Sequence, residues 1–152
     1  MDNLNLAPFN IIGIAIRTTN ENNQAATDIP ALWDHFIKEN ILEKIPNKVD
    51  NTVYALYTDY ESDHTRPYTT ILGCKTENLN VVPDGMMGRT FEGGDYIKFT
   101  TRGNLAKGLI IREWQKIWET DLDRRYTLDF EVYGEKARNP SDAEVDIMIA
   151  VA

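Results

Sequence analysis

The sequence predicts an α+β fold in which two βαββ units form one antiparallel sheet, with two helices on one face and a cleft between them. Segments rich in β-branched and aromatic residues alternate with segments whose apolar residues recur at helical spacing. The order strand, helix, strand, strand occurs twice along the chain. Because neither half has enough apolar residues for its own core, we expect the halves to share one sheet.

The first unit spans about residues 9–76. Thr27 and Asp28 are candidate caps for its helix, and Pro30 fits the first helical turn. The polar segment 61–66 is typical of a hairpin loop between the last two strands. The predicted elements are a strand over 9–19, a helix over 27–40, and strands over 52–60 and 67–76.

The second unit spans about residues 89–152. A constant offset links the two helices, since Trp33 and Trp114 are 81 positions apart and the same shift carries Ile29 to Ile110. Such matches indicate two copies related by a pseudo-twofold axis. The predicted elements are a strand over 89–101, a helix within 104–120, and strands over 128–134 and 145–152.

Length and composition bound the class of protein. With 152 residues, 42% of them hydrophobic, we expect a single domain over residues 1–152. The sequence has no apolar run long enough for a membrane span and no signal peptide at the N-terminus, so we expect a cytoplasmic protein without membrane contact. Cys74 is the only cysteine, in an apolar segment typical of a buried strand.

The charge disfavours direct binding to nucleic acid. Acidic residues outnumber basic ones 24 to 16, which gives a net charge of −8 that repels phosphates and attracts cations. Arg124 and Arg125 form the one notable basic pair, and we expect Asp121 and Asp123 beside them to neutralise it in a loop.

Familiar catalytic, cofactor and metal motifs are absent. The glycines of segment 94–108 lack the closing Gly-Lys-Ser/Thr of a phosphate loop. His35, expected on the outer face of its helix, and His64, in the hairpin loop, have no ligand partners at metal spacing. We therefore expect no cofactor, no metal and no catalytic residue, although a carboxylate acting as general base leaves enzymatic activity open.

Aromatic residues on the helices and strands are candidates for a binding cleft. Trp114 shares an apolar helical stripe with Ile110 and Trp118, and either core packing or a cleft explains it. The repeat favours a cleft, because it places Trp33 opposite Trp114. Within strand 52–60, alternation places Tyr57 on one side, and Tyr54 and Tyr60 on the other.

Glu131 is the candidate anionic group. Alternation in strand 128–134 places it on one side with Asp129 and Tyr133, opposite Phe130. If this side faces solvent, Glu131 has no role. If it faces the helices, the carboxylate is buried and favours a counter-charge, which Arg112, Lys98 or a ligand cation could supply.

Six segments taken in order resemble the AraC-effector or GyrI-like family, especially its stand-alone branch associated with integron cassettes. They are IPALWDHF, YALYTDY, YTTILGC, GDYIKFTTRG, IIREWQKIW and LDFEVYG. The resemblance covers nearly the whole chain. It implies a duplicated βαββ fold with a ligand cleft between the helices, which larger regulators use to sense drugs.

The resemblance also implies roles for individual residues. The glutamate of the late strand, Glu131 here, meets a cationic ligand, while Trp33, Tyr57 and Trp114 form aromatic walls. We expect a binding module for cationic, hydrophobic or aromatic small molecules. The alternatives are a hydrolase with Glu131 as general base, and a regulator that acts through a protein partner or as a homodimer. With strands expected from Phe9 to Ala152, we expect no DNA-binding module in this chain.

Overall fold

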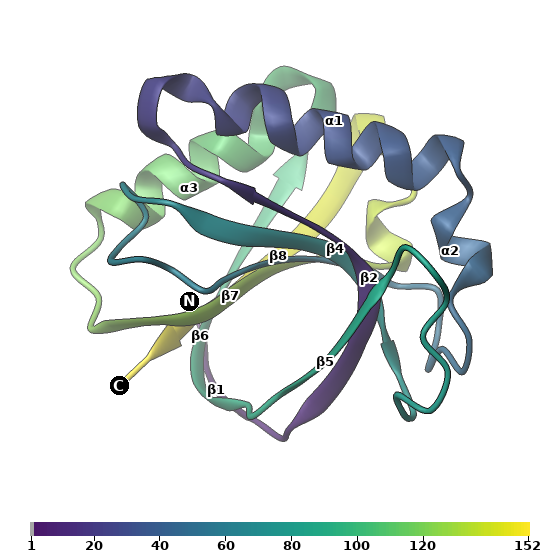
Figure 1. Cartoon of the computed structure of the whole chain (residues 1–152). Coiled ribbons are helices and arrows are strands. Elements are labelled where there is room, and N and C mark those ends of the chain that lie inside the picture. Colours follow the sequence, from purple (N-terminus) through teal and green to yellow (C-terminus); the bar gives the residue numbers. More distant parts are fainter. Residues whose placement is uncertain (1) are drawn as a thin grey trace.

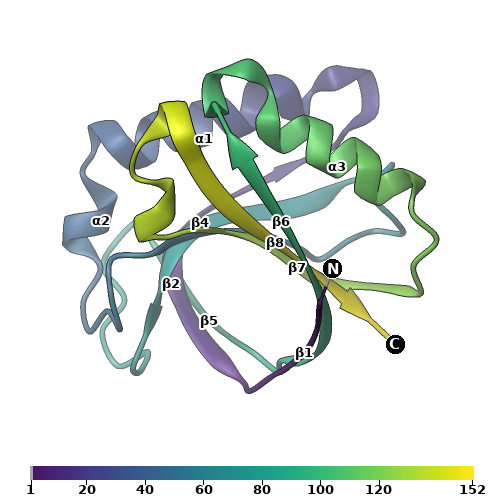
Figure 2. The same ribbon diagram turned by 180° about the vertical axis from the view of Figure 1, so that it is seen from behind.

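One antiparallel sheet of eight strands organises the computed structural model, which describes residues 2–152. Helices α1 and α3 cover one face of this sheet (Figures 1 and 2). The strands are β1 (Asp2–Leu6), β2 (Phe9–Thr18), β3 (Val53–Thr58), β4 (Tyr68–Thr76), β5 (Met87–Phe91), β6 (Gly94–Gly103), β7 (Arg124–Tyr133) and β8 (Ala143–Val151). The helices are α1 (Ala25–Lys38), the short α2 (Ile41–Lys44) and α3 (Leu109–Glu119).

The strand order β1-β6-β8-β7-β3-β4-β2-β5 confirms the duplicated fold. Unit β2-α1-β3-β4 contributes neighbours β2-β4-β3, and unit β6-α3-β7-β8 contributes β6-β8-β7 in the same relation. The units meet where β3 pairs with β7, so that Val53 lies opposite Tyr133 and Ala55 opposite Glu131. The central pair of strands therefore lies under both helices.

The two edge strands are exchanged between the halves. β1 precedes β2 but pairs with β6, and β5 precedes β6 but pairs with β2. Strand β1 was not predicted. The prediction of a single strand over 89–101 is wrong, because the chain turns at Gly93 and forms two strands there, β5 and β6. This residue has φ +82°, and a Cβ there would lie 2.2 Å from the carbonyl oxygen of Leu6, so only glycine fits.

Helix α1 begins two residues before its predicted cap, at Ala25. Asp28 does not cap the helix; its Oδ2 accepts hydrogen bonds from the Thr18 hydroxyl at 2.9 Å and the Gln24 amide at 3.0 Å. Pro30 consequently lies inside the helix, where its ring nitrogen cannot donate to the preceding turn. His35 lies on the exposed face, as predicted.

Two apolar clusters lie on the two faces of the sheet. The one under the helices includes Phe36, Leu72, Ile117 and Ile147, and the one on the other face includes Ile71 and Phe130 among others. Cys74 is fully buried in the first cluster, as predicted. No helix within residues 2–152 combines the length and apolar character needed to cross a membrane.

Side-chain alternation was predicted correctly in β7 and in part in β3. Phe130 packs in the apolar cluster on the face of the sheet away from the helices, while Tyr133 packs in the cluster under the helices. Tyr57 also lies under the helices, opposite to Tyr54, but so does Tyr60, which was expected with Tyr54. The reason is Asp59, whose left-handed backbone (φ +50°) ends the alternation one residue earlier.

Candidate functional site

A cavity of about 1020 Å³ lies between α1 and α3, at the position of the predicted cleft. Its sides are residues of both helices, and its base is formed by the central strands β3 and β7. All three tryptophans of the chain line it: Trp33, Trp114 and Trp118. Its other aromatic lining residues are Tyr57, Tyr60, Tyr68, Tyr133 and His64.

The Glu131 carboxylate is the centre of a hydrogen-bonded cluster at the base of this cavity. Its Oε2 accepts from the Tyr57 hydroxyl at 2.9 Å and from the Trp114 indole Nε1 at 2.7 Å. Its Oε1 accepts from the Tyr133 hydroxyl at 2.6 Å. Three donors from β3, α3 and β7 thus fix one carboxylate that is only 2% exposed.

Burial and hydrogen bonding act in opposite directions on the pKa of Glu131. Desolvation is the larger effect and raises this pKa, while the bonds from Tyr133, Trp114 and Tyr57 lower it. Burial and the nearby carboxylate raise the pKa values of the Tyr57 and Tyr133 hydroxyls well above 10, so both phenols stay protonated and donate.

No protein cation neutralises Glu131 within residues 2–152. The two basic residues considered as partners are engaged elsewhere, because Lys98 pairs with Asp2 at 3.8 Å and the Arg112 guanidinium donates to the carbonyl of Lys107. Three neutral donors are the only polar partners of Glu131 in the part of the chain that the structure describes. Such an arrangement keeps a carboxylate in place without cancelling its charge.

The predicted aromatic residues fall into two groups. Tyr57 and Trp114 bind Glu131 directly and contact each other edge to face, with ring centroids 5.6 Å apart. Trp33 also lines the cavity but reaches this cluster through Tyr133, whose ring lies 5.0 Å from its own. Trp114 thus holds the carboxylate directly, whereas Trp33 reaches it only through Tyr133.

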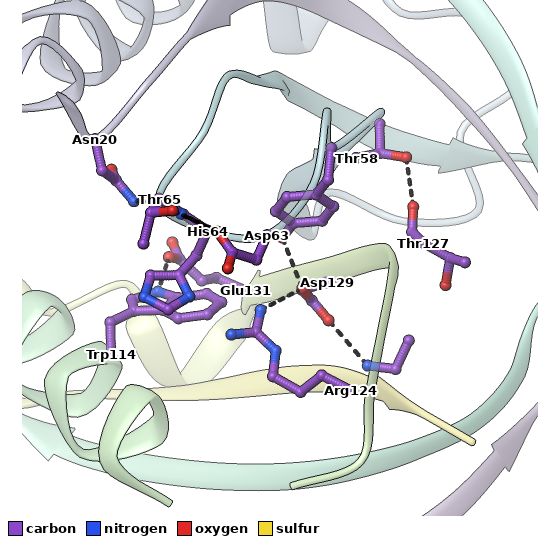
Figure 3. Close-up of polar contacts among 12 residues, drawn as sticks. Asn20, Thr58, Asp63, His64, Thr65, Trp114, Arg124, Thr127, Asp129 and Glu131 are labelled. Carbon is purple, nitrogen blue, oxygen red and sulfur yellow. Dashed lines mark hydrogen bonds and ion pairs between the residues drawn. The ribbon is translucent and has the colours of Figure 1, made fainter.

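A second polar cluster, formed around Arg124 and Asp129, lies nearer the start of β7 than Glu131 does, and it was not predicted (Figure 3). Arg124 forms an ion pair with Asp129 at 2.8 Å, with side chains only 5% and 0% exposed. Asp129 also accepts from the Tyr60 hydroxyl at 2.6 Å and the backbone N–H of Ala150 at 2.9 Å. The expectation that Arg124 lies in a loop neutralised by its acidic neighbours is therefore wrong.

Two further residues border this second cluster. The indole of Trp118 stacks on the imidazole of His64, with ring centroids 4.9 Å apart and planes 8° from parallel. The loop that holds His64 is fixed by Asn20, whose side chain donates to the His64 carbonyl at 2.7 Å and accepts from the Tyr68 hydroxyl at 2.8 Å.

Some of these residues could have been found from the sequence. Tyr133 shares the face of Glu131 by simple alternation, and Trp118 shares the stripe of Trp114. Arg124 carried no such signal, because its partner is five residues along the same strand and the backbone between them is irregular. Tyr126 has φ +56°, and the pairing of β7 with β8 shifts register between Arg124 and Asp129.

An aromatic cavity between two symmetry-related helices is typical of a small-molecule effector-binding domain. The comparisons identify the family. Residues 5–151 match the family of integron-associated effector binding proteins, and the chain belongs to that family.

Three relatives show how far the likeness extends. YobU of Bacillus subtilis, named as a transcriptional regulator, is 29% identical over 91% of this chain and 89% of its own length. An integron cassette protein from the mobile metagenome of Vibrio cholerae is also 29% identical, with a TM-score of 0.76 over 99% of this chain and 95% of that one. A structure of SAV2435 bound to tetraphenylphosphonium shares the fold, with 15% identity and a TM-score of 0.80 over 99% and 93% of the two chains.

Proposed function

We propose that this protein binds cationic, hydrophobic or aromatic small molecules in the cavity between α1 and α3, with Glu131 as the anionic anchor. The observation that carries the proposal is the buried Glu131 carboxylate, which three neutral donors hold in place and no cation among residues 2–152 neutralises. A ligand cation would supply the missing charge.

The surroundings of Glu131 favour a flat or aromatic cation. Trp33 and Trp118 line the cavity, and an aromatic face attracts a cation by about 0.5–2 kcal/mol per contact. Removing an apolar ligand from water adds about 25 cal/mol for each Å² buried. The acidic protein, with a net charge of −8, also attracts cations over longer distances.

Tetraphenylphosphonium, the compound in the SAV2435 complex, is a suitable first probe because it combines one positive charge with four phenyl rings. The proposal extends that ligand class to this chain. The same site gives less support to the hydrolase alternative. Three donors already occupy most acceptor positions of Glu131, so activating a water would require one of these bonds to be released.

The decisive experiment compares two ions of the same shape and opposite charge. Tetraphenylphosphonium and tetraphenylborate are titrated into the protein, with tryptophan fluorescence and calorimetry as readouts. We expect the cation to bind with a dissociation constant at least 100-fold below that of the anion. Equal affinity for both ions would show that shape and apolar contact alone govern the cavity, and the proposal would be wrong.

A further inference from the structure

The cavity contains unpartnered hydrogen-bond donors at a distance from Glu131. Arg124 uses Nη2 for its bond to Asp129, and its Nε and Nη1 have no partner among the described residues although the side chain is only 5% exposed. Within the same residues, the indole Nε1 of Trp118 and the Nδ1 of His64 are also buried without partners. All three side chains line the same cavity as Glu131.

These groups have the chemistry of an acceptor-binding site. A guanidinium and an indole N–H can only donate hydrogen bonds, and buried donors in native proteins are nearly always paired. The imidazole can take either role, because burial and the nearby Arg124 lower the pKa of His64 and keep the ring neutral. An oxygen atom of a ligand is the natural partner for such a group of donors.

The charges of the cavity decide which kind of oxygen fits. Asp129 already balances Arg124, so this end of the cavity has no net charge, and Glu131 leaves one uncompensated negative charge. A singly charged cation neutralises the site, whereas a zwitterion would leave it unbalanced. A neutral acceptor such as a carbonyl oxygen therefore fits better than a carboxylate.

We infer that the cavity has two polar subsites and selects monocations that also carry a neutral hydrogen-bond acceptor, with Glu131 binding the charge and Arg124 and Trp118 binding the acceptor. The inference rests on the proposed function and specifies its ligand class. Glu131 and Asp129 are two residues apart on β7, which separates their backbones by about 7 Å. A ligand with one substituted aromatic ring between its charge and its acceptor can span such a separation.

The test uses five phosphonium ions that differ only in the substituent on one ring. Tetraphenylphosphonium is compared with a derivative that has an acetyl group on one ring, in its meta and para isomers, and with the matching isopropyl derivatives, which have similar size and no acceptor. We expect one acetyl isomer to bind at least tenfold more tightly than its isopropyl counterpart. Equal affinities would overturn the inference while leaving the proposed function intact, whereas a failure of every phosphonium to bind would overturn the proposed function.

Variants assign the effect to the donors. Trp118→Phe keeps an aromatic ring and removes the N–H, and we expect it to reduce the acetyl preference several-fold, with the isopropyl derivative less affected. Trp33→Phe is the matched control and should change both ligands equally. The double variant Arg124→Met with Asp129→Asn removes the guanidinium without leaving a buried charge unpaired, and it should abolish the preference. Retention of the full preference in both Trp118→Phe and the double variant would refute the assignment.

A ligand with a carboxylate in place of the acetyl group separates the two kinds of acceptor. We expect this zwitterion to bind more weakly than the acetyl derivative, because it adds a negative charge to a cavity that already has an excess of one. Tighter binding of the zwitterion would contradict the preference for a neutral acceptor.

Discussion

Replacing Glu131 with glutamine removes one charge from the cavity and almost nothing else. The side chains are similar in size, and the glutamine oxygen can accept from Tyr57 and Trp114 as Oε2 does now. The amide nitrogen then faces Tyr133, whose hydroxyl can rotate to accept in place of donating. The variant should therefore fold with every polar atom of this cluster still paired.

The expected loss of affinity follows from the distance between the charges. The charge of tetraphenylphosphonium lies behind its phenyl rings, about 6 Å from a contacting carboxylate, and two unit charges at that distance interact by about 2.8 kcal/mol at an effective dielectric constant of 20. Desolvation offsets part of this energy. We expect the dissociation constant to rise about 10- to 100-fold.

Intrinsic fluorescence suits this measurement, because the three tryptophans of the chain all line the cavity. The control is Glu119→Gln, which removes the same charge from an exposed position at the end of α3. It should change the affinity less than twofold. A Glu131→Gln variant with native thermal stability and an unchanged dissociation constant would refute the role of this carboxylate.

Four further predictions concern pH and stability. Burial raises the pKa of Glu131 above its usual 4.5, so between this value and the folded pKa the folded state holds a proton that the unfolded state releases. The stability of the wild type relative to Glu131→Gln should therefore fall as pH rises through this range. Parallel urea titrations at several pH values test this, and a constant difference between the two proteins would contradict it. Over the same range, calorimetry should show affinity for tetraphenylphosphonium rising with pH. Arg124→Met should lower the free energy of unfolding by about 3–5 kcal/mol, because it leaves Asp129 buried without a counter-charge. Adding Asp129→Asn should restore most of this free energy. Denaturant unfolding that shows a loss under about 1 kcal/mol would indicate that the pair is not buried in solution. Gly93→Ala should lower the free energy of unfolding by about 2 kcal/mol or more, because of backbone strain and a collision with the carbonyl of Leu6. Amide hydrogen exchange in β1 should become faster. Exchange rates in β1 equal to those of the wild type would argue against this account.

The sequence was sufficient for the main elements because their patterns are local. Two helical stripes related by one offset, and strands with regular alternation, led to the correct fold and placed Glu131 on the same side of its strand as Tyr133. Burial of Glu131 could not be deduced from alternation alone, since either face of the strand was compatible with the pattern. The family resemblance favoured the buried face.

The errors occurred where a single backbone angle departs from the regular pattern. Asp59 and Tyr126 adopt positive φ, and each changes the direction of the side chains beside it, so that Tyr60 and Arg124 enter the cavity. Tyrosine rarely adopts such a conformation, and aspartate does so more often than most residues but far less readily than the glycine at position 93. The ion pair of Arg124 with Asp129 helps to hold this irregular segment, and it lay beyond the reach of pattern analysis.

The exchanged edge strands have a consequence for how the molecule assembles. Leu4 pairs with Tyr96 and Phe9 with Phe91, so each half completes its sheet with a segment of the other half. During synthesis, the N-terminal strand has no partner until the ribosome has produced most of the chain. We expect the edges to close late and together, which makes folding slow for a protein of this size. Two fragments separated between β4 and β5 should each be incomplete alone and should recover the native sheet when mixed.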